Sequence, residues 1–150
     1  MDIKYRKAEI QDIPLLIETR KVQLIHEGIE PSVNIDKELE DFFYHVFNNN
    51  AIYQVIGYID NQLVATGAIC IYDYPPSYTN KTGKIAYVTN MYTDINYRKK
   101  GYATHILNLL EKEAKKRKIE IMRLGASSLG KPVYLKFGFK EDDVWMSKKL

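Results

Sequence analysis

The chain has 150 residues, near the commonest size of one domain, and no stretch rich in Pro, Gly or Ser divides it, so residues 1–150 are expected to form a single domain. The 22 Lys and Arg against 19 Asp and Glu leave a net charge of only +3, which does not by itself indicate a nucleic-acid partner. A single cysteine, Cys70, excludes an internal disulfide. With no signal-like N-terminus and no long apolar run, the sequence favours a cytoplasmic protein without a membrane partner.

The first elements are expected to be a strand and a helix. Residues 3 to 7 alternate between apolar and polar side chains, as in a strand with one buried face. An apolar stripe with helical spacing then runs from residue 13 to about residue 27, with Asp12 placed to cap the helix and Pro14 in its first turn. The strand is therefore expected to lead directly into an amphipathic helix.

A second helix and a hairpin are expected next. Leu and Phe recur at helical spacing after Pro31, until a polar run at residues 48–50. Residues 52–59 and 63–72 are rich in β-branched and aromatic side chains, and the Asp60-Asn61-Gln62 segment between them is typical of a tight turn. The central part of the chain thus predicts a helix followed by two antiparallel strands.

Strands and helices alternate in the second half. Residues 84–93 have strong β character and lead towards a helix whose apolar stripe covers residues 103–114. Residues 121–126 predict another strand, residues 132–137 a short helix, and residues 144–148 a last strand. This order indicates an α/β or α+β fold, with helices on both faces of one sheet.

The turn that joins the strand at residues 84–93 to the next helix is the first candidate site. A helix that starts here leaves its first N–H groups without intrahelical partners, and Gly101 and Ala103 leave room for an anion to approach them. Three cations precede the glycine: Arg98, Lys99 and Lys100. The turn has neither the Walker nor the dinucleotide-binding glycine pattern, so a phosphate site of another kind or an ordinary basic helix start both stay open.

Two motifs resemble those of the GCN5-related N-acetyltransferases, the GNAT superfamily. Residues 87–103 resemble the family's motif A, because Arg98, Gly101 and Ala103 match its Arg or Gln, its glycine and its final Gly or Ala in order. Residues 130–139 resemble the next motif, a short helix that carries a tyrosine and ends in Gly-Phe. The resemblance covers nearly the whole chain. It implies a mixed, largely antiparallel sheet of six or seven strands, with helices on both faces and a splayed central strand pair.

The same resemblance implies an acetyl-CoA-dependent N-acetyltransferase that moves an acetyl group directly to a primary amine of a small molecule or peptide. Tyr134 would protonate the departing CoA thiolate, and a strand amide near Tyr92 would stabilise the charge that develops on the acyl oxygen. Ser127 stands where the family often has Asn. The expected cofactor-binding residues are Met91, Tyr92, Thr93, Arg98, Lys99, Lys100, Gly101, Tyr102, Ala103, Thr104 and Ser127.

Several functional questions stay open at the level of sequence. Glu27 and Asp94 are both candidates for the general base that takes the amine proton. The three histidines have no metal-type spacing, so no metal is expected. A non-catalytic CoA-binding module of the same fold is the alternative function, and a nucleic-acid-binding domain is disfavoured because basic and aromatic residues do not interleave. The acceptor amine, the use of other acyl groups and the formation of a homodimer are not determined.

Overall fold

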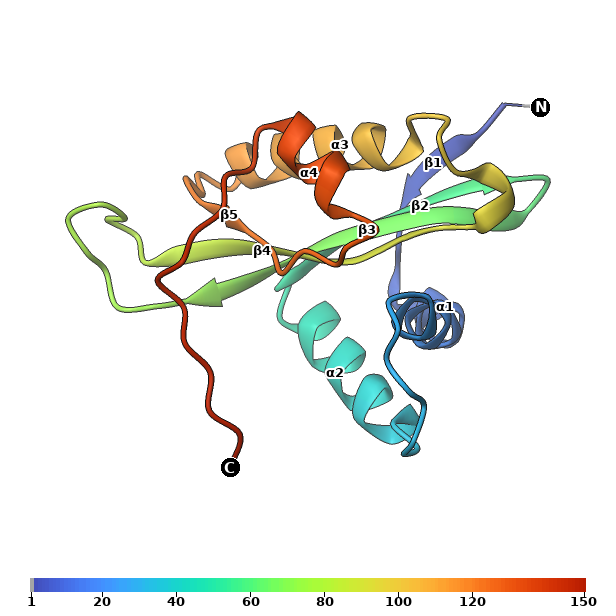
Figure 1. Ribbon diagram of the computed structural model, residues 1–150, viewed down its shortest axis with the longest axis horizontal. Coiled ribbons are helices and arrows are strands. Elements are labelled where there is room, and N and C mark those ends of the chain that lie inside the picture. The colour runs from blue at the N-terminus through green and yellow to red at the C-terminus, as the bar shows by residue number, and fades with distance from the viewer. Residues whose placement is uncertain (1) are drawn as a thin grey trace.

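A five-stranded sheet runs through the middle of the molecule in the computed structural model, which describes residues 2–150 (Figure 1). The elements in chain order are β1 (Lys4–Lys7), the 3-10 turn η1 (Ile10–Asp12), α1 (Ile13–His26), α2 (Asp36–Asn48), β2 (Ile52–Ile59), β3 (Gln62–Asp73), β4 (Lys84–Thr93), the 3-10 turn η2 (Ile95–Tyr97), α3 (Tyr102–Lys116), β5 (Met122–Arg123) and α4 (Lys131–Phe137). Helices α1 and α2 cover one face of the sheet, and α3 and α4 cover the other (Figure 1).

The sheet is mixed and largely antiparallel, as expected. Its order is β1-β2-β3-β4-β5, and only the β4–β5 pair is parallel. Strands β2 and β3 form the expected hairpin, in which Ile59 pairs with Gln62 across Asp60 and Asn61. Both turn residues have positive φ, 48° and 64°, a conformation that Asp and Asn tolerate better than most residues do.

Successive residues of β3 point into two separate apolar layers. Cys70 packs with Leu16 of α1 and Phe43 of α2, whereas Ile69 packs with Leu107 and other residues of α3. All five side chains are almost fully buried. Burial also raises the pKa of the Cys70 thiol to about 12, so this cysteine is a small core residue and stays protonated.

Two local expectations at the start of the chain and at its end were wrong. Asp12 precedes α1, but its carboxylate does not cap that helix. It accepts two hydrogen bonds from Arg6 instead, at 2.7 and 2.8 Å, and these lower the pKa of Asp12. Residues 144–148 do not form a strand, and Val144 and Met146 are 74% and 95% exposed. Alternating apolar and polar residues form a strand only where a partner strand is available. Here Trp145 stacks on Arg123 instead of pairing with β5.

The predicted count of six or seven strands is therefore corrected to five among residues 2–150. The predicted strand at residues 121–126 is also shorter than expected, because only Met122 and Arg123 pair with β4. Their partners are Ala86 and Tyr87, and no pairing with β5 continues along β4 beyond Tyr87. The second half of β4 consequently has a partner strand on one side only.

A β-bulge marks the place where β4 leaves its regular register. Thr66 pairs with Tyr92 and Ala68 pairs with Thr89, so Gly67 of β3 faces two residues, Asn90 and Met91. Asn90 has a φ of 56° and is buried. A buried hydrogen-bond chain holds the bulge: Asn90 donates to Gln54 Oε1 at 3.3 Å, and Gln54 donates to Thr66 Oγ1 at 3.0 Å. The bend is thus fixed by three strands rather than by β4 alone.

Gly67 provides a test of how tightly the bulge is packed. A Cβ at this position would lie 2.3 Å from Met91 Sδ and 2.8 Å from Ile106 Cγ2. We expect Gly67→Ala to lower the free energy of unfolding by about 1–3 kcal/mol, the usual cost of overpacking, as measured by urea denaturation. Gly125→Ala is the control, since its nearest contact would be an ordinary 3.7 Å. Equal stability of the two variants would mean that the bulge yields to an added methyl group.

Candidate functional site

A cavity of about 530 Å³ lies between the end of α1, the second half of β4, the start of α3, and α4 with the loop before it. It follows from the limited β4–β5 pairing, because the unpaired edge of β4 forms one wall and the loop after β5 the other. Most of the sequence-predicted site residues line this one cavity: Met91, Tyr92, Thr93, Arg98, Lys99, Gly101, Tyr102, Ala103, Thr104, Ser127 and Tyr134.

Lys100 is the one predicted cofactor-binding residue that does not line the cavity. Its ammonium lies 5.3 Å from the centre of the Tyr97 ring. The preceding Lys99 has a left-handed backbone with φ 61°, and this turn of the chain leaves Lys99 at the cavity and Lys100 outside it. The geometry thus favours Lys99 over Lys100 as a charge available to a ligand.

The start of α3 presents free backbone donors to the cavity. The helix has no side-chain cap, and a 3.0 Å bond from His105 N to Gly101 O closes its first turn. The N–H groups of Tyr102, Ala103 and Thr104 therefore have no acceptor within the helix, and all three residues line the cavity. Gly101 enters the helix with a φ of 81°, which other residues adopt only with strain. These aligned N–H groups and the helix dipole favour an anion at this wall.

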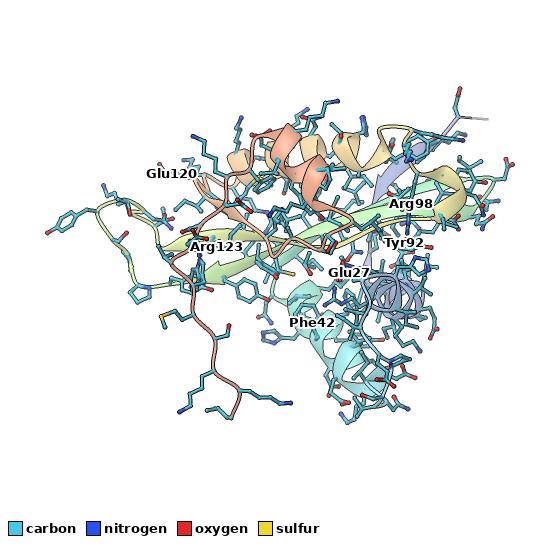
Figure 2. The ribbon with its side chains drawn as sticks, viewed as in Figure 1. Glu27, Phe42, Tyr92, Arg98, Glu120 and Arg123 are labelled. Atoms are coloured by element: carbon cyan, nitrogen blue, oxygen red, sulfur yellow. The ribbon has the colours of Figure 1, made fainter. Side chains whose placement is uncertain are left out.

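Arg98 connects the end of β4 to the end of α1. Its Nε donates to Thr93 O at 3.0 Å, and its Nη2 lies 3.1 Å from His26 Nδ1. Because a guanidinium can only donate, Nδ1 of His26 is the acceptor in this bond. The His26 ring also packs 5.8 Å from the ring of Tyr92, and Figure 2 shows Arg98 and Tyr92 together above α1. Part of the charge of Arg98 thus serves to hold the cavity wall.

Tyr134 is held in place by packing on two sides. A Cβ at Gly130 would lie 2.7 Å from its ring, so only glycine leaves room for the ring there. Phe139 packs edge-on at 6.0 Å between ring centres. Burial raises the pKa of Tyr134 to about 12, with smaller contributions from the charge of Glu27 and from Tyr87. The phenol therefore keeps its proton at neutral pH and can donate it or a hydrogen bond into the cavity.

The two candidates for a general base differ in position. Glu27 lines the cavity, and its Oε1 accepts a 3.1 Å hydrogen bond from Gln23. Asp94 is not among the lining residues, and its carboxylate accepts from the N–H of Asn96 at 2.9 Å, which caps η2. The geometry therefore favours Glu27, whose carboxylate is also close enough to Tyr134 to affect its pKa.

Ser127 has a structural partner at the edge of the cavity. Its Oγ accepts from the N–H of Gly130 at 3.2 Å and so supports the turn that leads into α4. The hydroxyl proton stays available to donate to a ligand. The reach of a serine at this position is short, so its contribution to ligand binding is expected to be small.

Sequence reasoning did not identify Gln23 as a cavity residue and assigned no role to His26, although both line the cavity. They lie on α1, about 70 residues before the basic turn in the sequence, and an isolated Gln or His on a helix gives no local signal. Among residues 2–150, no three His, Cys, Asp or Glu side chains are placed to share a metal ion. Over the same residues, no helix is long and apolar enough to span a membrane.

Comparison with known proteins finds a consistent set of similarities. Residues 20–139 match the model of the Acetyltransferase (GNAT) family. The structure is similar to that of a predicted acetyltransferase from Clostridium acetobutylicum that was crystallised with acetyl-CoA, with 49% sequence identity, a TM-score of 0.97, and coverage of 99% of this chain and 96% of the other. A comparison with curated proteins finds no significant match.

More distant structures share the fold alone. A GCN5-related N-acetyltransferase from Ralstonia eutropha JMP134 has 20% identity and a TM-score of 0.92, with 99% of each chain covered. Glucosamine-6-phosphate N-acetyltransferase from Arabidopsis thaliana also has 20% identity, with a TM-score of 0.73 and 99% of each chain covered. The arrangement of helices around the splayed sheet is therefore common to proteins of very different sequence.

The contact between Arg98 and His26 can be measured with a double-mutant cycle of Arg98→Gln and His26→Ala. Because the pair is exposed, we expect a coupling of only about 0.5–1 kcal/mol in the free energy of unfolding. A coupling indistinguishable from zero would argue against this hydrogen bond.

Proposed function

Because the chain belongs to the Acetyltransferase (GNAT) family, we propose that it transfers the acetyl group of acetyl-CoA directly to a primary amine of a small molecule or peptide. One observation carries this proposal: a single cavity joins the free N–H groups of α3, the unpaired edge of β4 and the phenol of Tyr134. The related structure with acetyl-CoA, at 49% identity, supports the same cofactor.

The two ends of the cavity wall suit two parts of the cofactor. The N–H groups of Tyr102, Ala103 and Thr104 face an anion and would hold the pyrophosphate, with Lys99 as a nearby cation. Along β4, Asp94 N donates to Val64 O at 2.8 Å, so the backbone of the preceding residue, Thr93, faces the free edge. That edge would bind the amide groups of the pantetheine arm in the manner of a neighbouring strand.

The oxygen of the acyl group needs a donor where negative charge develops. Met91 is the next residue on the free edge of β4, two positions before Thr93, and the bulge at Asn90 directs this part of the strand towards the cavity. We therefore assign the donor expected near Tyr92 to the backbone N–H of Met91. Its role would be electrostatic, because the amide is fixed before the charge appears.

When bound, acetyl-CoA supplies a thioester: the N–C bond forms, the C–S bond breaks, the amine loses one proton and the CoA sulfur gains one. Tyr134 is the proposed donor to the sulfur, since its pKa of about 12 keeps the phenol protonated. Glu27 is the proposed acceptor of the amine proton, directly or through a water molecule. No acyl-enzyme is required, and buried Cys70, with a pKa of about 12, is unsuited to form one.

CoA binding at the start of α3 can be tested by thermal unfolding. Millimolar CoA should raise the melting temperature, because a ligand that binds only the folded state stabilises it. Gly101→Val should abolish this shift, since a branched side chain would strain the turn and occupy the approach to the N–H groups. Gly28→Val is a matched control: Gly28 also has a positive φ, 86°, and open space around it, but it does not line the cavity.

Calorimetry should confirm the loss of CoA binding in Gly101→Val. If CoA raises the melting temperature of this variant as much as that of the wild type, the start of α3 does not bind CoA. Absence of any shift in the wild-type protein would count against both the enzyme and the CoA-binding module.

Replacing Tyr134 distinguishes an enzyme from a module that only binds CoA. Tyr134→Phe removes one hydroxyl and should lower the rate of thiol release from acetyl-CoA about 100-fold or more, while CoA still binds. The rate is measured with an amine identified in a screen of amine classes. Tyr53→Phe is the control, because this half-buried tyrosine packs on the same face of the sheet as α3 but does not line the cavity. A loss below about threefold would mean that solvent protonates the sulfur.

A further inference from the structure

One face of α1 carries a cation, an amide and a carboxylate in line. Arg20, Gln23 and Glu27 are spaced at i, i+3 and i+7, so they share a face of the helix. Arg20 Nη1 donates to Gln23 Oε1 at 3.3 Å, and Gln23 Nε2 donates to Glu27 Oε1 at 3.1 Å. Gln23 is 5% exposed and, like Glu27, lines the cavity. The backbone positions of Arg20 and Glu27 are about 10 Å apart along the helix axis, and the two hydrogen bonds bring their charged groups closer together than that.

Arg20 is half-buried and forms no ion pair among residues 2–150, whereas Arg6 and Arg117 each pair with a carboxylate. Its helix packs with Cys70 of β3 on the lower face of the sheet, and the charge of Arg20 lowers the pKa of that thiol against the larger effect of burial. A half-buried charge is costly unless it is neutralised. Within residues 2–150, the only side-chain partner of Arg20 is the neutral amide of Gln23, at the long distance of 3.3 Å.

A second arginine, Arg123 of β5, lies on the same face of the sheet as Cys70. Cys70 pairs with Tyr87, and Tyr87 pairs with Arg123, so these three residues form a row across β3, β4 and β5 on one face of the sheet. The guanidinium carbon of Arg123 lies 4.3 Å from the centre of the Trp145 ring, and it too forms no ion pair in the described part of the chain. Two half-buried arginines without a carboxylate therefore lie near the two ends of this row, Arg20 by Cys70 and Arg123 beside Tyr87.

Tyr87, the middle residue of this row, also lies close to the proposed proton donor Tyr134. It is close enough to Tyr134 to influence the ionisation of that phenol, as Glu27 is. Figure 2 shows Glu27 beneath the sheet, on the side that α1 and α2 cover. An acceptor on this side of the sheet would therefore meet a carboxylate beside Tyr134 and positive charge farther away.

We propose that the acceptor is a primary amine whose carbon skeleton ends in a carboxylate or a phosphate, with the amine held at Glu27 and the anionic group at Arg20, supported by Arg123. This inference rests on the proposed function and names its substrate class. A span somewhat below about 10 Å suits a molecule as long as two or three extended residues, at roughly 3.4 Å per residue. A simple alkylamine would leave Arg20 desolvated and unpaired.

The experiment compares matched pairs of acceptors in acetyl-CoA turnover by the full chain, read by thiol release. The carboxylate arm uses triglycine and its C-terminal amide, and the phosphate arm uses an aminosugar with and without a phosphate. We expect kcat/KM for the anionic member of one pair to exceed that of its neutral counterpart about 10-fold or more, the usual worth of a hydrogen bond to a charged group. The arm that shows this preference identifies the anionic group.

Variants on α1 test whether Arg20 causes the preference. Arg20→Gln should bring the ratio of anionic to neutral turnover close to 1, mainly through KM, whereas Arg20→Lys should keep part of it. Lys21→Gln is the matched control and should keep the whole ratio, because Lys21 pairs with Glu18 and Asp36 and not with the Gln23 side chain.

Turnover of neutral amines with no preference in either arm, or a preference that survives Arg20→Gln, would overturn this inference and leave the proposed function intact. Failure of every amine to release thiol would count against the proposed function itself. In that case binding provides the test: calorimetry of N-acetyl-triglycine with the CoA-saturated protein should show weaker binding to Arg20→Gln than to wild type. Equal binding by the two proteins of both this ligand and an N-acetylated aminosugar phosphate would also overturn the inference.

Discussion

The free edge of β4 beyond Tyr87 is the constraint on which the rest of the site depends. A strand that has a partner on one side only leaves a row of N–H and C=O groups unsatisfied, and such groups must find other partners or face solvent. Here one carbonyl, that of Thr93, is taken by Arg98, and the rest of the edge borders the cavity. The protein therefore keeps open, inside its own sheet, the kind of edge that most sheets cover.

Keeping this edge open requires that β4 bend away from β5 without losing β3. The bulge at Asn90 provides the bend, and the hydrogen bonds through Gln54 to Thr66 satisfy the polar side chains that the bend buries. No buried side-chain nitrogen or oxygen lacks a partner in the described part of the chain. A fully satisfied network of this kind favours one geometry over its competitors, so the cavity wall is held in one position before any ligand arrives.

Much of this architecture could be predicted from local sequence, and the parts that could not share one cause. The hairpin at Asp60 and Asn61 and the limits of β4 follow from turn chemistry and β propensity, which act over a few residues. Arg98 was identified as a cation in the turn, but its bonds to Thr93 and His26 depend on how α1 packs against β4. The strand expected at residues 144–148 failed for the same reason: a strand needs a partner, and a partner is a property of the fold.

The burial of Cys70 has a chemical consequence for a protein of this kind. The proposed reaction releases a free thiol at every turnover, and free thiols exchange with accessible cysteines when oxidants are present. Cys70 is the one cysteine of the chain, it is 1% exposed, and its raised pKa keeps it from forming a thiolate. A mixed disulfide between the protein and CoA would require an accessible sulfur and a thiolate. Burial of Cys70 in the core removes the access and disfavours the thiolate. The protein can therefore meet a pool of CoA without forming a mixed disulfide with it.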